Sequence, residues 1–90
     1  MQHGFYLTVT GKVQGVGYRR WFAKHAQAQG LKGYVKNLAN GEVEAVIVGE
    51  RAALQHMLDQ SLLGPKEAQV NYLNYQSSDD DHYTDFQIIN

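Results

Sequence analysis

The order of apolar and polar positions along the chain predicts five strands and two helices. Apolar residues recur at every second position over residues 5–10, 43–48 and 68–76, although in 43–48 most of the positions between them are apolar as well. Shorter runs of β-favouring residues cover 33–37 and 84–89. Residues 20–29 and 50–62 instead place apolar residues three and four positions apart, which is helical spacing. On the second helix these residues are Leu54, Met57, Leu58 and Leu62. The elements therefore follow the order βαββαβ, with one more strand at the end.

Glycine, asparagine and proline mark the ends of these elements. Gly30 suits the left-handed position after a helix, where Leu31 can fold back onto Ala26 as in a Schellman ending. The Asn-Gly pair at 40–41 is a strong hairpin signal between the second and third strands. Gly-Pro at 64–65 ends the second helix. Strands mixed with two helices in this way favour an α+β, ferredoxin-like βαββαβ sandwich, with both helices on one face of an antiparallel sheet.

The C-terminal part of the chain carries weaker signals. Alternation over 68–76 predicts that Val70 and Tyr72 share one face of a strand, with Leu73 and Tyr75 on the other. Residues 77–81 (SSDDD) are predicted to form a solvated loop, because adjacent carboxylates point in different directions and no calcium-loop pattern follows. Where the short C-terminal strand pairs is left open by the pattern.

Composition indicates one small globular domain, residues 1–90. The hydrophobic share of 43% is typical of a folded chain, and ninety residues suffice for one modest core. Eight basic and nine acidic residues give a net charge of -1, so we expect no nucleic-acid or membrane-surface partner. The chain has no cysteine, no signal-peptide pattern and no apolar run of membrane-spanning length. We therefore expect a soluble, cytoplasmic monomer.

The most distinctive segment is residues 11–19 (GKVQGVGYR), which holds three glycines and ends at Arg19, where the first helical pattern begins. Glycines let backbone N–H groups converge, and a helix start adds unpaired N–H groups and the positive end of the helix dipole. Such a concavity binds anions, phosphate above all, and Arg19 adds a planar charged fork. The spacing excludes a Walker A loop and a dinucleotide fingerprint. Spacing alone is equally compatible with a glycine-rich turn between a strand and a helix.

Other chemical constellations are not indicated. The four histidines are His3, His25, His56 and His82. No pair of them has metal-ligand spacing, so we expect no metal, and no serine sits in a recognisable triad. Asn37, at the end of the second strand, has two interpretations. It satisfies the backbone of the following turn, or it offers its amide group to an anion held by the loop.

Hydrolysis of a carboxyl–phosphate anhydride is a reaction that needs only these parts. Its leaving carboxylate has a pKa of about 4, so no general acid is required. The phosphoryl transition state is loose, and catalysis consists mainly of positioning and charge stabilisation. Backbone N–H groups and Arg19 could stabilise the charge, Asn37 could align a water, and a substrate oxygen could take the proton. No cofactor is needed. Inorganic phosphate, the product, should bind the same loop and inhibit.

Two segments resemble signatures of the acylphosphatase family: residues 13–19 (VQGVGYR) resemble the first, and residues 30–37 with 40–44 resemble the second. The resemblance is firm over residues 5–49 and thinner afterwards. It implies the same ferredoxin-like fold and hydrolysis of small acyl phosphates. It also implies that Arg19 binds the phosphate and Asn37 positions the water. The phosphate cradle would be the backbone of Gln14, Gly15, Val16, Gly17, Tyr18 and Arg19.

Three residues depart from the family pattern: Tyr18 stands where phenylalanine is common, Tyr34 where tryptophan is common, and Asn40 where aspartate is common. None is a predicted catalytic position, but divergence after residue 50 leaves substrate preference open. Two alternatives remain. One is a non-catalytic anion-binding or regulatory module, because the ferredoxin-like fold hosts many functions. The other is an accessory domain of a larger hydrogenase-maturation carbamoyltransferase, whose N-terminal domain resembles acylphosphatases.

Overall fold

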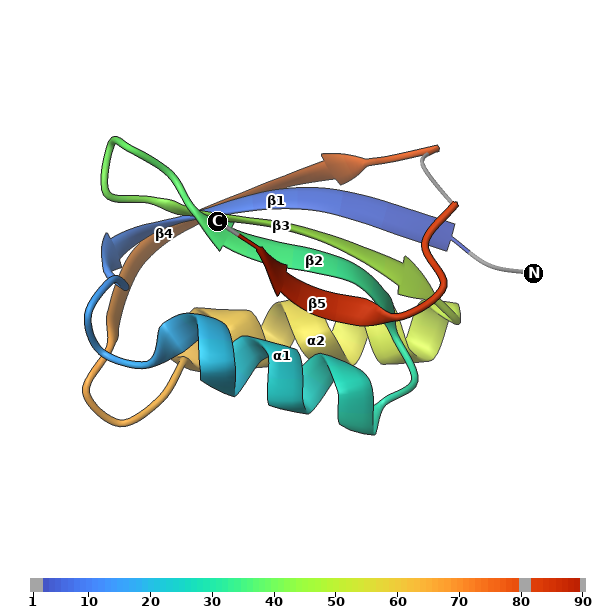
Figure 1. The fold of residues 1–90 in the computed structure, drawn as a ribbon, viewed down its shortest axis with the longest axis horizontal. Coiled ribbons are helices and arrows are strands. Elements are labelled where there is room, and N and C mark those ends of the chain that lie inside the picture. The colour runs from blue at the N-terminus through green and yellow to red at the C-terminus, as the bar shows by residue number, and fades with distance from the viewer. Residues whose placement is uncertain (1–2, 80–81, 90) are drawn as a thin grey trace.

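A computed structural model describes residues 3–79 and 82–89. Two helices pack on one face of a five-stranded sheet (Figure 1), which confirms the predicted ferredoxin-like α+β sandwich. The strands are β1 (His3–Lys12), β2 (Lys32–Asn37), β3 (Val43–Gly49), β4 (Gln69–Ser77) and β5 (Phe86–Ile89), and the helices are α1 (Tyr18–Ala28) and α2 (Arg51–Leu63). Residues 80–81 of the predicted acidic loop lie outside the described residues.

The strand order in the sheet is β4-β1-β3-β2-β5. Both β1 and β2 are antiparallel to β3, so they run in the same direction and their C-terminal ends meet at one edge of the sheet. The position of the last strand, which the sequence pattern left open, is beside β2 and parallel to it. The sheet is therefore not wholly antiparallel. β4 ends beside Phe5, at the end of the sheet where β1 and β2 begin. The chain passes from there to the other side of the sheet and begins β5 beside the start of β2, so β5 and β2 run parallel.

The hydrophobic core lies between the sheet and the two helices. Its fully buried side chains include Leu7, Val9, Phe22, Ala26, Val35, Val43, Ala45, Ile47, Leu54 and Met57. One predicted core member is wrong: Leu62 is 53% exposed, whereas Ser61 is fully buried in its place. The Ser61 hydroxyl donates to the Met57 carbonyl at 2.6 Å, which satisfies its hydrogen bonding. The last turn of α2 packs against the Tyr18 side chain, and a small residue fits that contact.

A β-bulge in β4 changes which side chains share a face of this strand. Thr10 pairs with Tyr72, but Gly11 pairs with Val70, so Asn71 is an extra residue on β4. Val70 is thereby turned to the same face as Leu73, and both pack against the core cluster. Tyr72 remains on the opposite face and is 57% exposed. The expectation that Val70 and Tyr72 share a face was therefore wrong.

The predicted Schellman ending of α1 is confirmed. Gly30 has a φ of 72°, and its N–H donates to the Gln27 carbonyl at 3.1 Å. The Leu31 N–H donates to the Ala26 carbonyl at 3.0 Å. These two bonds satisfy carbonyls that the helix end would otherwise leave without donors, and they turn the chain directly into β2.

The Tyr18 side chain ties the start of α1 to the end of α2. Its hydroxyl donates to the Ser61 carbonyl at 2.7 Å in the buried core. A helical carbonyl ordinarily accepts the N–H four residues later, but here that residue is Pro65, which has none. Burial raises the pKa of Tyr18 well above its ordinary value, which keeps the hydroxyl protonated as a donor. The hydroxyl group that distinguishes Tyr18 from the phenylalanine common at this position therefore has a specific hydrogen-bond partner, the Ser61 carbonyl.

Replacing Tyr18 with phenylalanine is expected to lower the free energy of unfolding by about 1–3 kcal/mol, because the Ser61 carbonyl would stay buried without a donor. Urea denaturation measures the change. Tyr72→Phe is the matched control, since the Tyr72 side chain is 57% exposed, and it should change stability by no more than about 0.5 kcal/mol. Equal stability of the two variants would contradict the role of the Tyr18 hydroxyl.

Candidate active site

The glycine loop leaves β1 after Lys12 and leads into α1 at Tyr18. Gly15 and Gly17 have φ angles of 74° and 80°, in the left-handed region that favours glycine. Gly17 precedes the first residue of α1, and in the described part of the chain no side chain caps this helix start. A Cβ at either glycine would have no heavy atom within 4 Å. The backbone is therefore open to a ligand at both positions.

Two of the other predicted cradle residues, Val16 and Tyr18, turn their side chains toward the core. Tyr18 is buried in the core, and Val16 packs partly against it. Their backbone N–H groups, rather than their side chains, are thus the groups that the loop can offer to an anion. Arg19 is the second residue of α1 and is partly buried, whereas the adjacent Arg20 is exposed. The helix dipole adds to the positive charge at this end of α1.

Asn37 ends β2 at the same edge of the sheet. It pairs with Val43, and Val43 pairs with Val9 on β1, so one strand separates Asn37 from the strand that leads into the loop. Two strand spacings correspond to about 10 Å. Asn37 Oδ1 is buried and has no hydrogen-bond partner among the described residues. A buried oxygen without a hydrogen bond typically lowers the stability of the folded state by about 1–3 kcal/mol. In native structures such an atom often marks a place for a water, an ion or a catalytic role.

The side chain of Gln14 joins the loop to the β2–β3 hairpin. Its Nε2 donates to the carbonyls of Leu38 and Glu42, each at 2.9 Å. From the sequence, only the backbone of Gln14 was predicted to belong to the site, and this side-chain contact was not predicted. The two acceptors are backbone carbonyls 24 and 28 residues away, and no motif spacing in a single sequence identifies such partners.

The hairpin is also held by its own side chains. Asn40 Oδ1 accepts the Glu42 N–H at 3.0 Å, and Asn40 Nδ2 donates to Glu42 Oε1 at 3.1 Å. Thr10 donates to the other carboxylate oxygen of Glu42 at 2.7 Å. An aspartate at position 40 would lack the donor and would repel the Glu42 carboxylate. The departure at Asn40 is therefore matched to Glu42 in this chain.

The third departure, Tyr34, lies on the sheet face that the helices leave uncovered. Tyr34 and Tyr6 donate to the two carboxylate oxygens of Glu44, at 2.8 and 2.7 Å. The hydrogen bond to Glu44 raises the pKa of Tyr6 to about 12. Lys36 Nζ is 3.9 Å from the same carboxylate. This cluster joins β1, β3 and β2 across the sheet and contains no predicted site residue.

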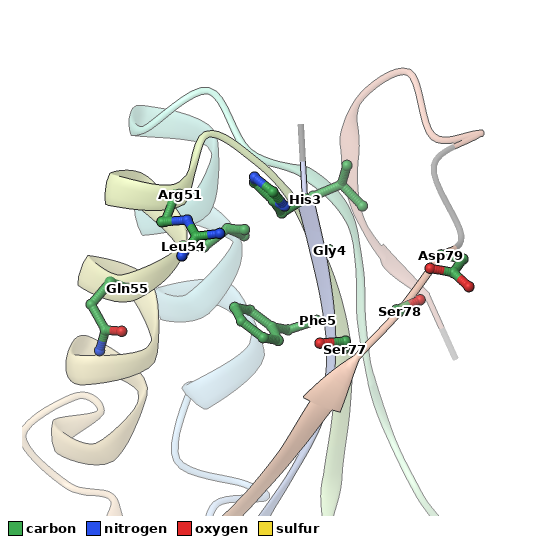
Figure 2. Close-up of a pocket in the computed structure, with 10 residues that line it drawn as sticks. His3, Gly4, Phe5, Arg51, Leu54, Gln55, Ser77, Ser78 and Asp79 are labelled. Carbon is green, nitrogen blue, oxygen red and sulfur yellow. The ribbon is translucent and has the colours of Figure 1, made fainter. Parts of the chain in front are cut away.

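A cavity of about 590 Å³ lies at the opposite end of β1 from the glycine loop (Figure 2). Figure 2 shows His3 and Phe5 on β1 beside Arg51 and Leu54 at the start of α2, with Asp79 just beyond β4. No predicted site residue lines this cavity. The proposed anion site is instead the open backbone surface of the loop.

Residues 3–79 and 82–89 show neither a metal-ligand cluster nor a membrane-spanning helix. No group of three or more histidine, aspartate or glutamate side chains in these ranges is placed to hold a metal ion. Neither helix described there is long and apolar enough to cross a membrane.

The fold and the loop define a small α+β protein in which a glycine-rich connection meets a helix start. The family model described as Acylphosphatase matches residues 5–88. An acylphosphatase of Methanothrix thermoacetophila is 42% identical over 83 residues, which cover 92% of either chain. The chain belongs to the acylphosphatase family.

Solved structures agree with this assignment. An acylphosphatase from Coxiella burnetii superposes with a TM-score of 0.94 at 36% identity, over 98% of this chain and 93% of that one. An acylphosphatase from Bacillus subtilis gives a TM-score of 0.94 at 30% identity, over 100% of both chains. The fold of this chain is therefore shared over 93% of the Coxiella relative and 100% of the Bacillus relative.

Proposed function

We propose that the protein is an acylphosphatase, which hydrolyses the carboxyl–phosphate bond of small acyl phosphates to a carboxylate and inorganic phosphate. The observation that carries this proposal is the buried Oδ1 of Asn37, which has no hydrogen-bond partner among the described residues and lies at the end of the sheet where the glycine loop leaves β1. The names of the relatives from Methanothrix, Coxiella and Bacillus support the same activity.

The phosphoryl group is proposed to bind to the backbone N–H groups of residues 14–19. Gly15 and Gly17, with their positive φ angles, leave the backbone open at these two positions. The start of α1, which no described side chain caps, adds N–H groups and a favourable dipole. Arg19 supplies a permanent charge and a fork for two phosphate oxygens. These fixed donors stabilise the charge of the transition state as well as that of the substrate.

Asn37 is proposed to hold the attacking water through its carbonyl oxygen. The water oxygen attacks phosphorus in line with the acyl oxygen, and the P–O bond to the acyl group breaks as the carboxylate leaves with the electron pair. The proton of the water passes to a phosphate oxygen. A carboxylate needs no general acid to leave, because its conjugate acid has a pKa of about 4. The reaction is therefore proposed to proceed without a metal or a cofactor.

Further features of the activity follow from the same site. Inorganic phosphate should compete with substrate for the loop and stabilise the folded chain by mass action. The radius of gyration of 11.7 Å is near the value of about 12 Å for a compact domain of this length, and we propose that this domain acts as a monomer. The absence of cysteine suits a cytoplasmic location, and the net charge of -1 gives no support for a nucleic-acid partner.

A hydrolysis assay tests the proposal. Benzoyl phosphate should be turned over and p-nitrophenyl phosphate should be hydrolysed near background, because a phenolate leaves less readily than a carboxylate when no acid assists it. Activity should survive EDTA. Phosphate release and the loss of benzoyl phosphate absorbance measure both rates.

Three results would count against parts of this account. Comparable rates on both substrates would contradict the mechanism without a general acid. Loss of activity on chelation, restored by a divalent ion, would contradict metal independence. Binding of phosphate without turnover of any acyl phosphate would favour the alternative, a non-catalytic anion-binding or regulatory module.

A further inference from the structure

The amide group of Gln14 completes the neck of the β2–β3 hairpin. The Leu38 N–H donates to the Glu42 carbonyl at 2.8 Å, and the Gly41 N–H donates to the Leu38 carbonyl at 3.2 Å. Gln14 Nε2 donates to these same two carbonyls at 2.9 Å each. One primary amide carries two N–H donors, so both are used. Each of the two carbonyls then accepts one backbone bond and one bond from Gln14.

These bonds join the two parts of the site that the sheet does not join directly. The loop leaves the sheet after Lys12 on β1, while Asn37 ends β2, and β3 lies between these strands. Leu38, which accepts one of the two bonds, is the residue that follows Asn37. The side chain of Gln14 thus spans from the proposed phosphate cradle to the segment that holds the proposed water ligand.

We propose that Gln14 is a positioning residue, whose amide holds Asn37 at a fixed place relative to the phosphoryl group in the loop. This inference rests on the proposed function. In-line attack needs the water and the phosphorus atom in register, and a misplacement of about 1 Å can lower the rate about 100-fold. Gln14 acts through Asn37 and the loop, and its side chain does not itself contact the substrate.

Gln14→Leu keeps the approximate size of the side chain but removes both donors. We expect this variant to lose turnover while it still binds phosphate. The kcat on benzoyl phosphate should fall by about 10-fold or more, while the inhibition constant of inorganic phosphate changes by less than about threefold. The backbone cradle and Arg19 remain in this variant. The carbonyls of Leu38 and Glu42 also keep their backbone donors, so the chain should fold. Steady-state kinetics and thermal melting give the three quantities.

Gln27→Leu is the matched control. Gln27 also donates its amide to a backbone carbonyl, that of Phe86 at 3.0 Å, but it lies on the face of α1 beside β5. Loss of this bond should leave kcat near that of the wild-type protein. An equal fall of kcat in both variants would overturn the proposal, because the effect would then follow from the loss of any such bond.

Gln14→Glu provides a second test with a different readout. An ionised carboxylate would face two carbonyl oxygens and repel them, whereas a protonated carboxyl can donate to one. The two oxygens disfavour the charged form and raise the pKa of the introduced carboxyl above about 4.3. The kcat of this variant, divided by that of the wild-type protein, should therefore rise as the pH falls from 7 to about 4.5. A ratio that does not change with pH would contradict the donor role.

Failure of this proposal can be distinguished from failure of the proposed function. Turnover by the wild-type protein with an unchanged kcat in folded Gln14→Leu overturns only the positioning role. If the wild-type protein turns over no acyl phosphate, the connection between the loop and the β2–β3 hairpin is measured instead. Inorganic phosphate is titrated and the amide resonances of both segments are followed. Phosphate should then shift the resonances of Gly15 and Gly41 in the wild-type protein but only that of Gly15 in Gln14→Leu. A shift of Gly41 in both proteins, or in neither, overturns the proposal.

Discussion

Replacing Asn37 with alanine is expected to lower kcat by about 100-fold or more, with little change in the inhibition constant of inorganic phosphate. The proposed partner of Asn37 is the attacking water, which contributes to the reaction and hardly to ground-state binding. Asn37 lies on β2, whereas the cradle and Arg19 follow β1, so the variant keeps the groups that hold the phosphate. Kinetics on benzoyl phosphate, with phosphate as inhibitor, measures both quantities.

The alternative role of Asn37 is to stabilise the turn that follows it. In that case Asn37→Ala would lower the free energy of unfolding by about 1 kcal/mol and leave kcat unchanged. Asn40→Ala is the matched control, because Asn40 makes its two hydrogen bonds within the same hairpin, both to Glu42. It should lower stability without a comparable fall in kcat. A stable Asn37→Ala protein with wild-type kcat would refute the water-positioning role.

The secondary structure could be predicted because its signals are local. The alternation over residues 5–10 and 43–48 and the helical spacing of Leu54, Met57 and Leu58 arise from neighbours in the sequence, and each corresponding element is present. The pairing of β5 with β2 could not be derived in this way. This pairing depends on where β4, the outer strand on one side of the sheet, ends relative to β2 on the other side.

The predicted placements of two residues, Val70 and Leu62, were also wrong because they depend on contacts with residues distant in the sequence. Val70 changes face because of a bulge opposite Gly11 on β1, and a Cβ at Gly11 would collide with the Gln69 carbonyl. Leu62 is exposed because the buried stripe of α2 continues through Ser61 beside Tyr18. Both features depend on a partner that is distant in the sequence. Alternation within one segment carries no information about that partner.

The candidate site divides in a similar way. The glycines at 15 and 17 and the helix start beside them are visible in the sequence, and both glycines have positive φ angles at that helix start. The long-range bonds of Gln14 depend on how the hairpin lies against the loop. The same holds for the Asn37 oxygen, which has no hydrogen-bond partner within residues 3–79 and 82–89. They had no local signal. The catalytic roles of Arg19 and Asn37 stay predictions that variants must test.

Replacing Arg19 with glutamine is expected to weaken both phosphate binding and turnover. Arg19 lies in the first turn of α1, next to the open backbone of the loop, and its fork would contact the phosphoryl group in the substrate and in the transition state alike. Loss of a fixed donor in such a site typically costs about 3 kcal/mol, which corresponds to more than about 100-fold in kcat/KM. Unlike Asn37→Ala, this variant should also raise the phosphate inhibition constant.

Two further variants separate charge from geometry at this position. Arg19→Lys keeps the positive charge but loses the planar fork, so it should recover only part of the lost kcat/KM. Arg20→Gln removes the same charge from the next residue, which is exposed on another face of α1, and it should stay near the wild-type values. If Arg20→Gln were the more damaging of the two glutamine variants, the phosphate ligand would have to be reassigned to Arg20. If both were equally mild, the backbone N–H groups of the loop would have to supply the binding without either arginine.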